Sequence, residues 1–175
     1  MAHLLTVSGS LRVGSSNSAL LAAAAACVAS GVTVAPFVEL ASLPAFNPDE
    51  EAAGVIPASV LAWRRALTKA DAVLFSSPEY AHGIPGALKN ALDWIVGSGE
   101  MVNKPVGVLS ASAASQYAHP QLVEVLHVMS ARIIPSAVAI VDIPRRGVNA
   151  AGLLADPSIA AALRTVVAVL MHEVV

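Results

Sequence analysis

The stretch from Leu4 to Asn17 reads LLTVSGSLRVGSSN, and it joins patterns that belong to different secondary structures. Its apolar start, Leu4–Val7, predicts a short buried strand that runs into a loop of serine and glycine. The chain is then rich in alanine from Ser15 to Ser30, which predicts a helix capped by Ser15 or Ser16 and ended by Gly31. A strand, a loop and a helix in this order indicate an α/β fold.

The same alternation continues to the end of the chain, around a loop that Pro44, Asn47-Pro48 and Gly54 predict between residues 43 and 55. Apolar and β-branched runs predict four further strands, at residues 33–40, 72–76, 106–109 and 133–141. Helical spacing and Pro or Asp starts predict four further helices, at residues 57–70, from Pro85, at 120–132 and from Asp156-Pro157 to about 173. Such alternation predicts a doubly wound five-stranded parallel sheet covered by helices on both faces, with residues 1–175 forming a single domain.

Composition excludes several classes of function. The net charge is -2, and the longest basic clusters are the pairs Arg64-Arg65 and Arg145-Arg146, which argues against nucleic acid as a partner. The longest apolar run, residues 19–29, is far shorter than the roughly 20 residues that a membrane span needs. Cys27 is the one cysteine, and the N-terminus lacks the basic start of a signal peptide, so we expect a cytoplasmic protein.

The loop after the first strand is rich in groups that bind anions. It matches neither the P-loop nor the dinucleotide fingerprint, but it combines serine hydroxyls, an amide and a guanidinium with a helix N-terminus. These groups suit a phosphate dianion, and the residues are Ser10, Arg12, Ser15, Ser16 and Asn17. The alternative is a capped helix start with an arginine on the surface.

The loop after the third strand, Ser77–Gly86, contains two prolines and two glycines, which predict a rigid turn. Tyr80 gives it an aromatic surface at the end of the strand, where a flat heteroaromatic ring could lie. The alternative is an ordinary connecting loop with one exposed tyrosine.

Two segments resemble one family. Gly9–Asn17 is similar to the pattern G-S-x-R-x-x-S-x-N, and Pro78–Trp94, PEYAHGIPGALKNALDW, resembles P-E-Y-N-x-S-x-P-G-x-L-K-N-A-x-D-W. Leu43–Glu51 also matches a family loop. The family is that of the NAD(P)H-dependent FMN reductases, which include quinone, azo-dye and chromate reductases. The resemblance implies a flavodoxin-like fold with strand order 2-1-3-4-5.

The resemblance also implies roles for particular residues. The first loop would hold the FMN phosphate through Ser10, Arg12, Ser15 and Asn17, and through the backbone of Ser16. The second would line the ribityl chain and the isoalloxazine with Pro78, Glu79, Tyr80, Ala81, His82 and Gly83. The loop from Ser110 to Tyr117, including Ser112, would close over the other edge of the ring. This chain departs from the family at Ala81 and Gly83, where Asn and Ser are usual, and at Ala114-Ser115, where a glycine pair is common.

The function implied is an FMN-dependent oxidoreductase that takes hydride from NAD(P)H and reduces a small-molecule acceptor, such as a quinone, free flavin, azo compound or metal oxyanion. The resemblance implies no catalytic side chain, and the five histidines show no spacing typical of metal ligands. Charged residues make up only 13% of the chain, which suits a surface partly covered by other subunits and agrees with the family's homodimers and homotetramers.

One alternative function is that of a flavodoxin-type electron carrier, although no acidic cluster exceeds Asp49-Glu50-Glu51. The other is a flavin-free binding protein on the same fold.

Overall fold

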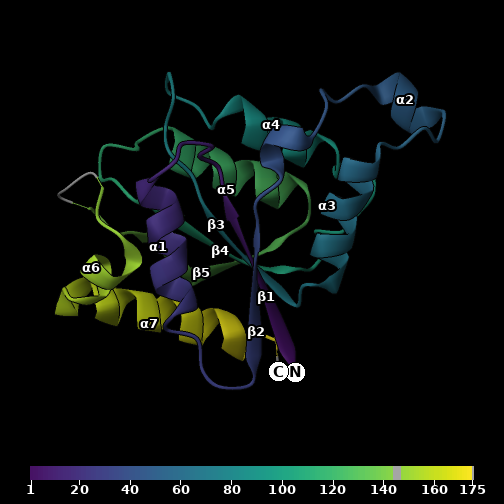
Figure 1. Cartoon of the computed structure of the whole chain (residues 1–175). Helices are drawn as coiled ribbons and strands as arrows, with labels where there is room; N and C mark the ends of the chain where they lie inside the picture. Colours follow the sequence, from purple (N-terminus) through teal and green to yellow (C-terminus); the bar gives the residue numbers. More distant parts are fainter. Residues whose placement is uncertain (144–146, 175) are drawn as a thin grey trace.

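A five-stranded parallel sheet forms the centre of the molecule (Figure 1). The computed structural model describes residues 1–143 and 147–174, so the pair Arg145-Arg146 lies outside the described residues. The strand order is β2-β1-β3-β4-β5, and every neighbouring pair is parallel, which confirms the predicted fold class. The strands are β1 Ala2–Ser8, β2 Val32–Phe37, β3 Ala72–Ser76, β4 Pro105–Ser110 and β5 Arg132–Ile140.

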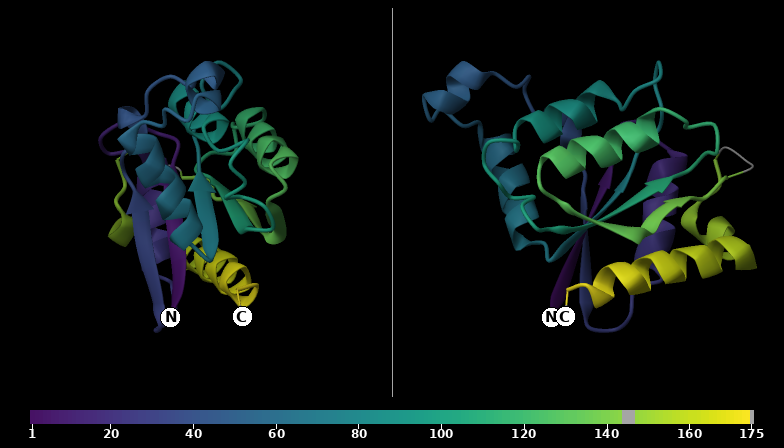
Figure 2. Two further views of the ribbon diagram at one scale, coloured as in Figure 1. Left: turned by 90° about the vertical axis from the view of Figure 1, so that its right-hand side faces the viewer. Right: turned by 180° about the vertical axis from the view of Figure 1, so that it is seen from behind.

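Helices cover both faces of the sheet (Figures 1 and 2). One face carries α1 Ser16–Ala25, α6 Ala150–Leu154 and α7 Pro157–His172, and the other carries α3 Ala58–Lys69, α4 Gly86–Asp93 and α5 Ala118–Val128. Each face has its own apolar core, because the strands are buried on both sides. Leu74 and Leu109 belong to the core on the face of α1, α6 and α7. Phe75 and Val108 belong to the core on the face of α3, α4 and α5.

Several predicted boundaries are wrong. Helix α1 ends at Ala25 instead of Ser30, so Cys27 lies just beyond the helix and is partly buried. Helix α5 ends at Val128, because Ser130 takes a φ of +59° and turns the chain into β5. The loop predicted at residues 43–55 contains the short helix α2, Pro48–Ala52, which Asn47 caps. The 3-10 turn η1, Leu40–Ser42, and helix α6 were also missed.

The carboxyl ends of β1, β3 and β4 meet at one edge of the sheet, and each ends in a serine. The loops that leave this edge pack closely. A Cβ atom on Gly9 would lie 2.6 Å from the Ser77 hydroxyl, so the first loop requires glycine at this position. Within the described residues, no helix has the length and apolar character to cross a membrane.

Candidate active site

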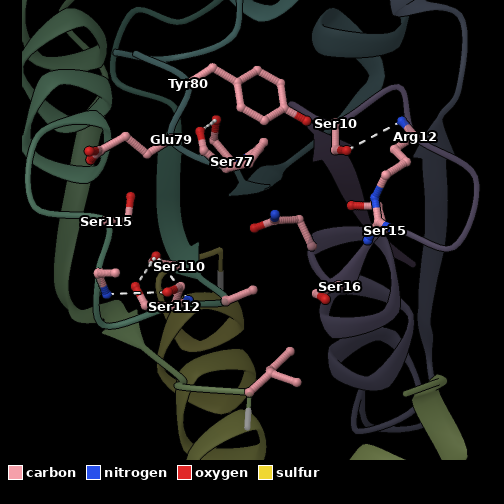
Figure 3. Close-up of a pocket in the computed structure, with 15 residues that line it drawn as sticks. Ser10, Arg12, Ser15, Ser16, Ser77, Glu79, Tyr80, Ser110, Ser112 and Ser115 are labelled. Carbon is pink, nitrogen blue, oxygen red and sulfur yellow. Dashed lines mark hydrogen bonds between the residues drawn. The ribbon is translucent and has the colours of Figure 1, made fainter. Parts of the chain in front are cut away.

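A cavity of about 500 Å³ opens at the carboxyl edge of the sheet, where binding sites of doubly wound folds lie (Figure 3). Its walls come from the loops after β1, β3 and β4 and from the segment that follows β5. The lining residues are Ser10, Arg12, Ser15, Ser16, Asn17, Ser77, Pro78, Glu79, Tyr80, Ser110, Ala111, Ser112, Ala114, Ser115 and Ile143. Ten of the thirteen residues predicted from the sequence are therefore brought together here.

The β1–α1 loop forms a wall of free hydrogen-bond donors. Ser15 is the N-cap of α1, and its hydroxyl accepts a hydrogen bond from the amide of Ser18 at 3.5 Å. The backbone N–H groups of residues 13–17 donate to no other part of the described chain. The guanidinium of Arg12 donates to the Gly14 carbonyl at 3.0 Å, so a cation lies beside these amides. Free amides at a helix N-terminus with an adjacent cation favour an anionic ligand.

The side chain of Asn17 is held by a hydrogen bond from strand β3. The Ser76 hydroxyl at the end of β3 donates to Asn17 Oδ1 at 2.8 Å, and both side chains are buried. Asn17 Oδ1 accepts this hydrogen bond, and the Nδ2 hydrogens are the donors that the side chain can offer to a ligand. This contact joins the first wall of the cavity to the central strand.

The β3–α4 loop makes a tight turn at the rim. Tyr80 and Gly83 exchange two backbone hydrogen bonds, of 2.9 and 3.1 Å, while Ala81 and His82 between them take φ values of +50° and +60°. These features define a type I′ turn. Tyr80 is 54% exposed, and Figure 3 shows its ring pointing across the cavity toward Ser10.

Three predicted site residues, Ala81, His82 and Gly83, lie outside the cavity lining. The turn carries them away from the wall, and His82 instead stacks on Tyr117, with ring centroids 4.3 Å apart and planes inclined by 26°. Ala81 and His82 are both exposed.

Glu79 lies at the cavity wall, but its carboxylate is used elsewhere. Oε2 accepts hydrogen bonds from the backbone amides of Tyr117 at 2.7 Å and Ala118 at 2.9 Å. Figure 3 shows the carboxylate turned away from Ser10 and Arg12. The hydrogen bonds from Ala118 and Tyr117 hold the pKa of Glu79 below its usual range.

The β4–α5 loop supplies the opposite wall, through Ser110, Ser112, Ala114 and Ser115. Ser115 is 5% exposed, and its hydroxyl is not within standard hydrogen-bond geometry of any polar atom of the described residues. It lies beside Glu79, and its interaction with that carboxylate is the last of the causes that lower the pKa of Glu79. Ser110, Ser112 and Ser115 make this wall polar, so it fits a polar ligand.

Sequence reasoning missed two kinds of lining residue. Ser77 and Ala111 lie within the predicted loops but were not named individually, although their place directly after β3 and β4 could have identified them. Ile143 follows β5, the edge strand, and no local pattern distinguishes it from an ordinary loop residue.

The chain belongs to the NADPH-dependent FMN reductase family, whose family model matches residues 2–144. This confirms the resemblance that the two sequence motifs indicate. The match includes all the strands and the three loops that form most of the cavity wall.

Individual relatives agree with the family. An NAD(P)H-dependent FMN reductase of Pseudomonas aeruginosa is 41% identical over 112 residues, which cover 63% of this chain and 60% of that protein. An NAD(P)H:quinone oxidoreductase of Solanum tuberosum is 44% identical over 88 residues, 49% of this chain and 45% of that protein. The match thus spans about half the length of these relatives. The flavoenzyme NAD(P)H:(acceptor) oxidoreductase FerB from Paracoccus denitrificans superposes with a TM-score of 0.77 at 25% identity, covering 99% of this chain and 97% of that one.

Proposed function

We propose that this protein is an FMN-dependent oxidoreductase that takes hydride from NAD(P)H and reduces a small-molecule acceptor such as a quinone. The observation that carries the proposal is the row of free amides at residues 13–17, next to Arg12, in a cavity of about 500 Å³. The family of the chain and the names of its relatives support the same function.

The residues of the cavity fit FMN at both ends. Ser10, Arg12, Ser15, Ser16 and Asn17 would hold the phosphate, because they offer donors and a positive charge with no acidic residue in the first turn of α1. Pro78 and Tyr80 would border the ring from one side, and the buried Ser115 hydroxyl and its neighbours would border it from the other. The cavity volume is within the range of about 300–1,000 Å³ that is typical of small-molecule sites.

The protein's part in the reaction is to bind and orient. When bound, FMN supplies the redox chemistry, namely hydride uptake from NAD(P)H and delivery of two electrons to the acceptor. The β1–α1 loop, residues 9–15, would fix the phosphate end of the cofactor site. The loops after β3 and β4 would fix the separation of the two walls at the ring end. We assign no side chain as a proton donor or acceptor.

Titration of the apoprotein with FMN and riboflavin, followed by quenching of flavin fluorescence, tests the phosphate site. We expect FMN to bind more tightly than riboflavin, and Arg12→Ala to weaken FMN binding tenfold or more while leaving riboflavin unchanged. The reason is that a hydrogen bond to a charged group is worth roughly 1.5–3 kcal/mol. Arg65→Ala, which removes an exposed arginine on α3, is the matched control. Equal affinities of the wild-type protein for FMN and riboflavin would refute the phosphate site.

We also propose that residues 1–175 act as one domain of a cytoplasmic homodimer or homotetramer. Leu11 and Val13, in the loop beside the cavity, are 55% and 97% exposed, which supports burial of this rim by a second subunit. Light scattering of the purified protein measures the number of subunits.

A further inference from the structure

Helix α5 begins without a cap from its own sequence. Its N-cap residue, Tyr117, makes no capping side-chain bond, and its first turn contains no acidic residue. Glu79, which follows β3, supplies the missing acceptor through its bonds to the amides of Tyr117 and Ala118. A carboxylate is favourable here because the N-terminus of a helix carries partial positive charge.

The loop before α5 is held at two points by carboxylates from neighbouring loops. At its start, Asp142, which follows β5, accepts a hydrogen bond from the amide of Ala113 at 3.0 Å. At its end, Glu79 accepts from Tyr117 and Ala118. Between these points lie Ala114 and Ser115, which form part of the cavity wall. The position of that wall therefore depends on both carboxylates.

Two further contacts join the β3–α4 loop to α5. The His82 ring stacks on Tyr117, and the amide of Ile84 donates to Gln121 Oε1 at 2.8 Å. The type I′ turn at Ala81-His82 places Glu79 on one side and Ile84 on the other, so that both reach the same helix. The loops after β3 and β4 are thus coupled across the mouth of the cavity.

We propose that Glu79 is a positioning residue, which sets the separation of the two walls that border the flavin ring by holding the β4–α5 loop against the β3–α4 loop. This inference rests on the proposed FMN site. It assigns the carboxylate of Glu79 to the backbone of α5, in place of the direct contact with the cofactor that the sequence resemblance implies.

The test compares Glu79→Ala, Glu79→Gln and the control Glu124→Gln, which changes an exposed glutamate on α5. Hydrogen exchange of the Tyr117 and Ala118 amides, measured by NMR on the apoprotein, reports the cap without any flavin. The dissociation constants of FMN and riboflavin are measured at a temperature where far-UV circular dichroism shows every variant folded. A loss of global stability alone does not alter binding under these conditions.

We expect Glu79→Ala to accelerate exchange of both amides and to weaken FMN and riboflavin about tenfold each, as for loss of one charge-assisted hydrogen bond. Both ligands should be affected equally, because the walls border the ring and the phosphate site is intact. Glu79→Gln should recover part of the loss through its remaining carbonyl oxygen, and Glu124→Gln should behave like the wild type.

Two results would overturn the positioning role: unchanged amide exchange in Glu79→Ala, or faster exchange with unchanged affinity for both flavins. Failure of the wild-type protein to bind FMN would instead refute the proposed function. The two failures are distinguishable, since the first needs a wild-type protein that binds FMN.

Discussion

Ala81 and His82 occupy the left-handed region of backbone conformation, which residues with a Cβ atom rarely adopt. The turn is maintained by the paired hydrogen bonds of Tyr80 and Gly83 and by the stacking of His82 on Tyr117. At the residue scale, two of the non-glycine residues with positive φ therefore lie in the loop that we propose to border the cofactor. Positions of this kind often belong to functional sites, because the surrounding structure must hold them.

Replacing Ala81 by Asn tests this strain. Asn adopts the left-handed conformation more readily than Ala and is favoured in type I′ turns, so we expect Ala81→Asn to raise the free energy of unfolding by about 0.5–1 kcal/mol. Urea denaturation of the apoprotein measures the change. Ala53→Asn is the matched control, since Ala53 is exposed and has a φ of -76°, where Asn has no such advantage. An unchanged or lower stability of Ala81→Asn would show that the turn is not strained.

The residues proposed to hold the phosphate could be identified from the sequence, because they are neighbours along the chain between Ser10 and Asn17. The contacts of Glu79 could not be identified in this way. The bonds that decide the role of Glu79 go to Tyr117 and Ala118, 38 and 39 positions away, and no local pattern contains that information. The position of His82 could not be predicted for a related reason, since its stacking on Tyr117 depends on how the two loops pack together.

At the scale of the element, helices were predicted best where a capping residue marks their start. Helix α7 begins at Pro157 after Asp156, as the sequence predicts. Helix ends were predicted poorly, because the alanine-rich stretch remains compatible with a helix beyond the point where α1 ends at Ala25. The short helices α2 and α6 have five residues each, too few to give a periodic pattern.

The cap of α7 predicts a pH dependence of stability. Asp156 accepts hydrogen bonds from the hydroxyl and the amide of Ser158 and from the amide of Ile159, and these hold its pKa below the ordinary value of 3.8. Because the pKa is lower in the folded state, the cap stabilises the protein above about pH 3.8 and is lost as pH falls through the lowered pKa.

We therefore expect Asp156→Ala to be less stable than the wild type at neutral pH, with the difference shrinking below about pH 3.8. Urea unfolding at a series of pH values measures it. Asp156→Asn is the control, because Asn caps helices without titrating. A difference between Asp156→Ala and the wild type that stays constant down to low pH would contradict a role of the charged carboxylate.

At the scale of the whole molecule, the alternation of strands and helices was sufficient to predict a parallel sheet with helices on both faces, and the resemblance supplied the strand order. The site follows from that topology, since the three serine-ended strands β1, β3 and β4 are neighbours only in the folded sheet. The sheet brings the loops after these strands to one cavity, although Ser10 and Ser112 are 102 positions apart in the sequence.

The central claim is that this cavity binds FMN for reduction by NAD(P)H. The most direct test is anaerobic mixing of the FMN-loaded protein with NADH or NADPH while the visible absorption of the flavin is followed. We predict that at least one nucleotide bleaches the flavin band within seconds, and that adding a quinone restores it. An absence of bleaching by either nucleotide, with full bleaching by a chemical reductant, would contradict the account and favour an electron carrier.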